Sequence, residues 1–246
     1  MTKQTKLVKC GTTIFLYDFQ GKGIKVKELG FERDAIKGRI TEMKRMLLTN
    51  FSNDSLLATF HLKISLSEYN QVPDKLNLFT RHLKESSGYH DIKYLAVTEL
   101  SPEKTKKHAY IHLITSVEIH ELTAFLNDDI SEEEEEQYFE DIWRDELSID
   151  VYSLKQLLDT FTSAYEGALK SNILREYPKS FYNNIEQPLI LWNEDAETFI
   201  KDHHLLEYPT YQSQEIYDEQ LGFVMINEYS LEQLDSHSND LNMFGF

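Results

Sequence analysis

Residues 93–115, which read KYLAVTELSPEKTKKHAYIHLIT, constrain the fold of this chain more than any other segment. Two runs rich in β-prone residues, Tyr94–Leu100 and Ala109–Thr115, flank a polar loop that contains Pro102. This pattern predicts an antiparallel hairpin with a long loop. Because successive side chains along a strand point to opposite faces, the sequence also predicts which residues of the hairpin share a face.

Glu99 lies on one face of the first predicted strand, and His108, Tyr110 and His112 share one face of the second. A carboxylate and an imidazole on neighbouring strands can meet, since directly opposed Cβ atoms lie about 5 Å apart. Glu99 and His112 are therefore candidate ligands of a divalent cation, with Tyr110 and His108 as further candidates. His108 and His112 lie about 13 Å apart in an extended strand, so a shared ion would need a bulge. A solvated Glu–His pair is the alternative.

Composition excludes several classes of protein. The chain has 246 residues, 41% of them hydrophobic, which fits one large globular domain or two small ones. No apolar run approaches the roughly 20 residues of a membrane span, so no membrane partner is expected. The polar N-terminus lacks a signal-peptide pattern, and the single cysteine, Cys10, excludes an internal disulfide. We therefore expect a cytoplasmic protein.

Charge is distributed unevenly along the chain. The net charge is −17, yet residues 1–127 carry 19 basic and 14 acidic residues, whereas residues 128–246 carry 6 and 28. The cationic half could bind nucleic acid phosphates, while the acidic half faces solvent or a protein partner. Acidic residues that only maintain solubility are the alternative. The acidic run at 128–146, DDISEEEEEQYFEDIWRDE, is expected to be a solvated helix or loop.

Hydrophobic periodicity predicts an α+β fold in which helices pack on an antiparallel β-sheet. The expected elements are a hairpin at 13–27, a helix at 33–50, a strand at 56–64, a helix at 76–85, the hairpin at 94–115, a strand at 149–152, an amphipathic helix at 154–170 and a strand at 221–229. We expect residues 1–171 to form the main domain. Residues 172–246 are expected to form an irregular appended region that packs on it.

The order of a strand with Glu99, a basic loop and a strand with His112 resembles the rolling-circle replication initiators of small plasmids and single-stranded DNA phages. Phe161 and Tyr165 on the predicted helix resemble the aromatic residue and the catalytic tyrosine of that family. Further similarity follows in the same order along most of the chain: CGTTIFLYDF at 10–19, LLATFHL at 56–62, Trp143, and REYPKSFYNNIEQPLIL at 175–191.

The resemblance implies a metal-dependent nuclease that nicks and rejoins single-stranded DNA at a replication origin. Tyr165 would be the nucleophile, and Glu99 and His112 would hold Mg²⁺ or Mn²⁺. Backbone contacts to DNA would come from basic residues, namely Lys104, Lys106, Lys107 and Arg81. Host replication proteins are expected to bind through the acidic half.

The chain departs from the family pattern at two positions. Tyr110 stands where the family has a second histidine, and Ala164 stands where it has a lysine. Tyr110 could be a weak metal ligand, a donor to a ligand, or the mark of a disabled metal site. Two alternatives to an active nuclease therefore remain: a degenerate initiator that binds DNA or a replication protein, and an acidic interaction protein that binds no DNA.

Overall fold

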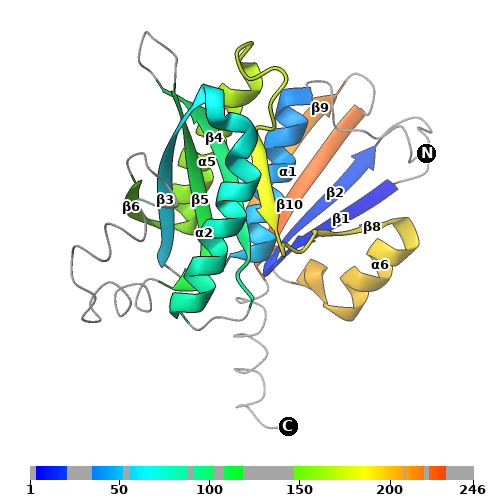
Figure 1. Cartoon of the computed structure of the whole chain (residues 1–246). Coiled ribbons are helices and arrows are strands. Elements are labelled where there is room, and N and C mark those ends of the chain that lie inside the picture. The colour runs from blue at the N-terminus through cyan, green and yellow to red at the C-terminus, as the bar shows by residue number, and fades with distance from the viewer. Residues whose placement is uncertain are drawn as a thin grey trace. The chain divides into compact units, whose positions relative to one another are not determined.

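The computed structural model describes residues 4–20, 35–51, 56–87, 91–101, 108–118, 147–207, 209–218 and 222–230. It divides the chain into two compact units, each with a five-stranded sheet (Figure 1). Unit 1 comprises Met1–Gly38, Leu48–Asn50 and Glu186–Phe246, and unit 2 comprises Arg39–Leu47 and Phe51–Ile185. The antiparallel sheets and the helices confirm the predicted α+β class.

Unit 2 contains the predicted hairpin at the centre of its sheet. Its elements are β3 (Leu56–Ser65), η2 (Leu66–Gln71), α2 (Val72–Ser87), β4 (Tyr94–Leu100), β5 (His108–Glu118), β6 (Leu147–Ser153), α5 (Leu154–Lys170) and β7 (Ser180–Asn183). The strand order is β6-β3-β5-β4-β7, and every neighbouring pair is antiparallel. The hairpin strands β4 and β5 pair in a continuous register from Tyr94 opposite Thr115 to Leu100 opposite Ala109.

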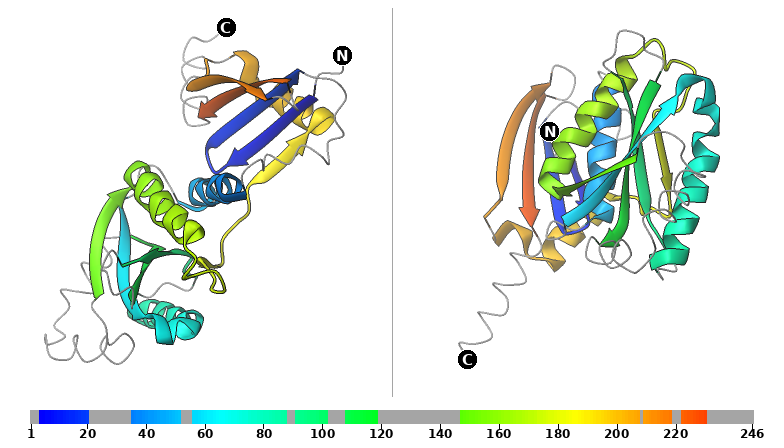
Figure 2. Two further views of the ribbon diagram at one scale, coloured as in Figure 1. Left: turned by 90° about the horizontal axis from the view of Figure 1, so that it is seen from above. Right: turned by 60° about the vertical axis from the view of Figure 1, so that its left-hand side comes forward.

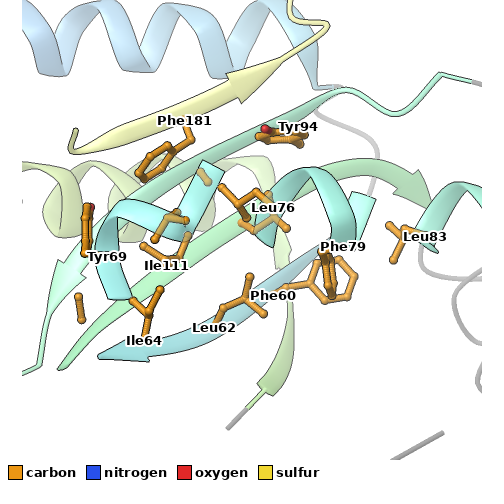
Figure 3. Close-up of a cluster of buried hydrophobic side chains, with 14 of the residues drawn as sticks. Phe60, Leu62, Ile64, Tyr69, Leu76, Phe79, Leu83, Tyr94, Ile111 and Phe181 are labelled. Atoms are coloured by element: carbon orange, nitrogen blue, oxygen red, sulfur yellow. The ribbon is translucent and has the colours of Figure 1, made fainter. Parts of the chain in front are cut away.

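One face of this sheet forms the main hydrophobic core with α2 (Figure 3). Phe60, Leu62 and Ile111 project from the sheet into this core, which Leu76 and Phe79 of α2 complete. The rings of Phe60 and Phe79 meet edge to face, with centroids 5.0 Å apart. Because side chains alternate along β3, the residue between Phe60 and Leu62 faces the opposite side of the sheet.

Helix α5 lies on that opposite side (Figure 2). It begins at a capping box, in which Ser153 accepts from the amide of Gln156 and the Gln156 side chain accepts from the amide of Ser153. Its buried face includes Leu157, Phe161 and Tyr165. The helix packs mainly along β4 and also contacts β6, so it covers the sheet face that α2 leaves free.

Unit 1 assembles strands from both ends of the chain. Its elements are β1 (Gln4–Cys10), β2 (Thr13–Gln20), β8 (Leu189–Trp192), α6 (Asn193–Asp202), η3 (Leu205–Glu207), β9 (Gln212–Asp218) and β10 (Gly222–Ser230). The strand order is β8-β1-β2-β10-β9. Helix α1 (Ala35–Asn50) contributes residues to both units.

The tight turn between β1 and β2 depends on Gly11. Its φ is +57°, and a Cβ atom at this position would lie 2.5 Å from the backbone oxygen of Leu48. A side chain here would therefore be strained and would also clash. The first strand of the hairpin predicted at 13–27 corresponds to β2, which pairs with β1, whereas its second strand falls in residues 21–34, outside the described residues.

The two sheets do not divide at residue 171. Strand β7 pairs with β4 in unit 2, whereas β8 and β10 pair with β1 and β2 in unit 1. The division fails because β7, which follows residue 171, joins the sheet of unit 2, while the later strands β8 and β10 join β1 and β2. The acidic segment 128–146 lies outside the described residues. In the part of the chain that the structure describes, no helix combines the length and apolar character needed to cross a membrane.

Candidate metal and proton-transfer site

Strand pairing in unit 2 places two histidines side by side on the face away from α2. His61 on β3 is directly opposite His112 on β5. On the outer strands, Val97 of β4 is opposite His112, and Asp150 of β6 is opposite Thr59. Since each residue shares a face with its cross-strand partner, His61, His112 and Asp150 all project from the face that α5 covers.

The two imidazoles form a close buried pair. His61 Nδ1 and His112 Nδ1 are 2.6 Å apart, and the ring planes are nearly perpendicular at 83°. The side chains are only 12% and 11% exposed. One nitrogen of this contact must carry the hydrogen and the other must accept it, so the tautomers of the two rings depend on each other.

A carboxylate flanks each end of the imidazole pair. Glu99 Oε2 lies 2.6 Å from His112 Nε2, and Asp150 Oδ2 lies 3.0 Å from His61 Nε2. Both carboxylates are open to solvent, with side chains 47% and 57% exposed. The hydroxyl of Tyr152 donates to Asp150 Oδ2 at 3.1 Å. The result is a row of contacting side chains across four strands, from Glu99 on β4 to Asp150 and Tyr152 on β6.

The electrostatics differ between the ends of this row. The pKa of His61 is lowered, chiefly because burial disfavours its charged form and also because His112 is close. The pKa of Glu99 is lowered, chiefly because His112 hydrogen-bonds to its carboxylate. Burial raises the pKa of Tyr152, and the hydrogen bond to Asp150 acts in the same direction. These shifts favour a neutral His61 and an ionised Glu99.

Glu99 and His112 have the donor chemistry for a divalent cation. Carboxylate oxygen and imidazole nitrogen both bind Mn²⁺, and Mg²⁺ prefers oxygen and retains several water ligands. Their 2.6 Å contact would have to widen slightly to admit an ion with ligand bonds of about 2.1 Å. Among the described residues, no three His, Cys, Asp or Glu side chains converge on one ion-sized point. The site therefore offers two ligands, and water or phosphate oxygens would supply the rest.

The other predicted ligands lie on the same face but outside the contact. Tyr110 is directly opposite Glu99 and is half-buried. His108 is opposite Ser65 at the start of β5, and its buried Nδ1 has no hydrogen-bond partner. β5 pairs with both neighbours without a bulge between residues 108 and 114. His108 therefore remains about 13 Å from His112 along the strand and does not share an ion with it.

Tyr165 lies on α5, the helix that covers this face of the sheet, and its side chain is buried, with 7% exposed. No hydrogen bond joins it to Glu99 or His112 among the contacts of the described residues. The structure thus places Tyr165 on the side of the sheet from which Glu99 and His112 project, on a helix that packs along the strand carrying Glu99.

Arg81 is the one predicted DNA contact that lies within the described residues. Lys104, Lys106 and Lys107 lie outside the described residues. Arg81 is exposed on α2, whose apolar side packs on the opposite face of the sheet. A contact from Arg81 to DNA held at Glu99 would have to reach around the sheet.

Sequence reasoning missed three members of the row: His61, Asp150 and Tyr152. Each lies on a strand that was predicted, but the pairing of β3 with β5 and of β6 with β3 was not predicted. The polar residue within LLATFHLKI was the available signal, since an alternating strand that buries Phe60 and Leu62 must direct His61 to the other face.

No protein-family model matches the chain, and neither the curated proteins nor the solved structures include a significant match.

Proposed function

We propose that this chain is a rolling-circle initiator-like enzyme that nicks and joins single-stranded DNA. The observation that supports this most strongly is the contact between Glu99 and His112. The hairpin predicted it, and β4 and β5 bring these two side chains to 2.6 Å. A helix with a buried tyrosine covers the same face, in the chain order expected for such an enzyme.

In this proposal Glu99 and His112 hold Mg²⁺ or Mn²⁺, which when bound polarises the scissile phosphate and offsets its negative charge. Tyr165 supplies the nucleophile. Its phenolic oxygen forms a bond to phosphorus, while the bond to the 3′-oxygen breaks. The tyrosine proton passes to that oxygen through a base or water, which leaves a 5′-phosphotyrosine and a free 3′-hydroxyl. The reverse step rejoins the strand. The proposed compartment is the cytoplasm.

Covalent capture tests the tyrosine without knowledge of the origin sequence. A randomised single-stranded DNA library is incubated with the full chain and Mn²⁺, and protein–DNA adducts are isolated under denaturing conditions. We expect a Mn²⁺-dependent adduct that Tyr165→Phe abolishes. Tyr211→Phe, at a 69% exposed tyrosine of unit 1, is the matched control and should retain the adduct. An undiminished adduct with Tyr165→Phe would exclude Tyr165 as the nucleophile.

A second candidate function is that of a non-catalytic descendant that binds DNA or a replication protein. Tyr110 in place of a histidine, Ala164 in place of a lysine and the low exposure of Tyr165 favour it. This candidate predicts salt-dependent binding of single-stranded DNA without any adduct. The capture experiment combined with a binding titration therefore distinguishes the two functions.

A further inference from the structure

We propose that His61 and Asp150 are positioning residues which, when a divalent cation binds, favour the His112 tautomer whose Nε2 presents a lone pair beside Glu99. This inference rests on the proposed function, because it concerns how His112 binds a divalent cation. Neither His61 nor Asp150 contacts Glu99 in the row described above. They act only through the Nδ1–Nδ1 contact between the two rings.

The inference follows from counting hydrogens on the two rings. A neutral imidazole carries one N–H and one lone pair. If His112 binds a cation through Nε2, its hydrogen must be on Nδ1. That atom lies 2.6 Å from His61 Nδ1, which must therefore accept. The hydrogen of His61 is then on Nε2, and Asp150 Oδ2 lies 3.0 Å away.

Asp150 is thus the acceptor that makes the metal-binding tautomer favourable. The ion-pair contact with His61 Nε2 lacks hydrogen-bond alignment, and this nitrogen has no other partner among the described residues. The Asp150 side chain is 57% exposed and can rotate to align with it. Without this acceptor, a buried N–H would remain unsatisfied, which is unfavourable.

The opposite tautomer cannot bind an ion through Nε2. In the contact as it stands, His112 Nε2 lies 2.6 Å from Glu99 Oε2 and donates to that carboxylate, so it offers no lone pair until an ion takes the place of this hydrogen. In that tautomer His61 Nε2 presents its lone pair to the Asp150 carboxylate, which is repulsive. The burial of both rings, with 12% and 11% exposed, limits rescue by water. The hydroxyl of Tyr152 donates to Asp150 Oδ2 and so keeps this carboxylate close to His61.

Mn²⁺ calorimetry on the full chain tests the inference. Asp150→Asn replaces the anionic acceptor with a weaker neutral one and is expected to weaken Mn²⁺ binding by about 10-fold, the lower end of the usual effect of altering a group that orients a metal-binding histidine. Tyr152→Phe should weaken it less, because the carboxylate remains. Asp159→Asn, an equal charge change at an exposed position of α5, is the control and should leave the affinity unchanged. Equal affinity for Asp150→Asn and Asp159→Asn would overturn the inference.

Nitrogen chemical shifts give a second measurement that a merely structural role would not change. In histidine-labelled protein with Mg²⁺, the hydrogen of His112 should reside on Nδ1 in the wild type and move toward Nε2 in Asp150→Asn. An unchanged tautomer in that variant would overturn the inference. If the wild type binds no divalent cation, the metal site of the proposed function fails as well. If the wild type binds and Asp150→Asn binds equally well, only the present inference fails.

Discussion

At the residue scale, a buried imidazole pair between two exposed carboxylates distinguishes this chain from a simple Glu–His contact. The pair contains His61, for which the neutral form is favoured because burial and the neighbouring His112 lower its pKa. A neutral His61 can accept from His112 while it donates to Asp150. The same pKa shift makes the stability of unit 2 depend on pH.

Stability is expected to fall as the pH decreases below the ordinary histidine value of 6.5 toward the lower pKa of folded His61. In that window the unfolded chain binds a proton at His61 and the folded chain does not, so protonation favours unfolding. His61→Gln should reduce the slope of the unfolding free energy against pH by up to about 1.4 kcal/mol per pH unit, which corresponds to the uptake of one proton. Urea unfolding at pH 7.5, 6.5 and 5.5 measures this. If the unfolding free energies of wild type and His61→Gln changed equally with pH, the assigned role of His61 would be contradicted.

Tyr110→His is expected to strengthen Mn²⁺ binding. Tyr110 is directly opposite Glu99 and two residues from His112 on the same face, so an imidazole there would add a third ligand near the ion. Calorimetry on wild type and variant measures the change. Lys63→His, at the residue opposite Tyr110 on β3, is a useful comparison because it places an imidazole on the same face but one strand farther from Glu99. An unchanged affinity for Tyr110→His would mean that Tyr110 does not face the ion.

At the element scale, the predicted elements of unit 2 were largely correct, whereas strand pairing beyond the hairpin could not be predicted. The strand at 56–64, the helix at 154–170 and the hairpin strands correspond to β3, α5, β4 and β5. Alternation within the hairpin predicted that Glu99 and His112 share a face, and the register of β4 and β5 places Glu99 opposite Tyr110, two residues from His112. The insertion of β3 next to β5, which adds His61, depends on long-range packing of Phe60 and Leu62 against α2. Local sequence carries no information on that choice of neighbour.

Helix α5 is expected to depend on its capping box. Ser153→Ala removes the acceptor for the Gln156 amide, which should lower the free energy of unfolding by about 1 kcal/mol. Ser163→Ala, at an exposed position inside the same helix, is the matched control and should be neutral or slightly stabilising. Denaturant titration compares the two. Equal stability of both variants would show that the cap does not contribute.

At the scale of the whole molecule, the charge asymmetry of the sequence does not follow the two units. Unit 1 contains 9 basic and 17 acidic residues, and unit 2 contains 16 and 25, so both are net acidic. The cationic N-terminal half and the acidic C-terminal half are therefore interleaved, because β1 and β2 pair with strands from the C-terminal end. Any DNA-binding surface must be a local basic region within an acidic protein.

Single-stranded DNA binding is accordingly expected to be opposed by the acidic run Glu132–Glu136. Replacing these glutamates with glutamine should raise affinity at low salt and matter less near 0.2 M, where the Debye length falls to about 7 Å. In a plot of the logarithm of the binding constant against the logarithm of the salt concentration, each neutralised phosphate should contribute about −0.7 to the slope. Fluorescence anisotropy with a labelled oligonucleotide measures both effects. If the glutamine variant bound DNA more weakly than the wild type, the glutamate run would be needed for structure or binding, and the expected repulsion would be contradicted.

The proposed nuclease function requires Glu99 and His112 to form a divalent cation site on the face of the sheet that α5 covers. Mn²⁺ calorimetry on the full-length wild type, Glu99→Gln and His112→Gln tests it most directly, with Glu68→Gln as a control at a half-buried glutamate outside the row. We expect one bound ion in the wild type and in Glu68→Gln, and loss of binding in both site variants. No binding in the wild type, or undiminished binding in Glu99→Gln and His112→Gln, would contradict it.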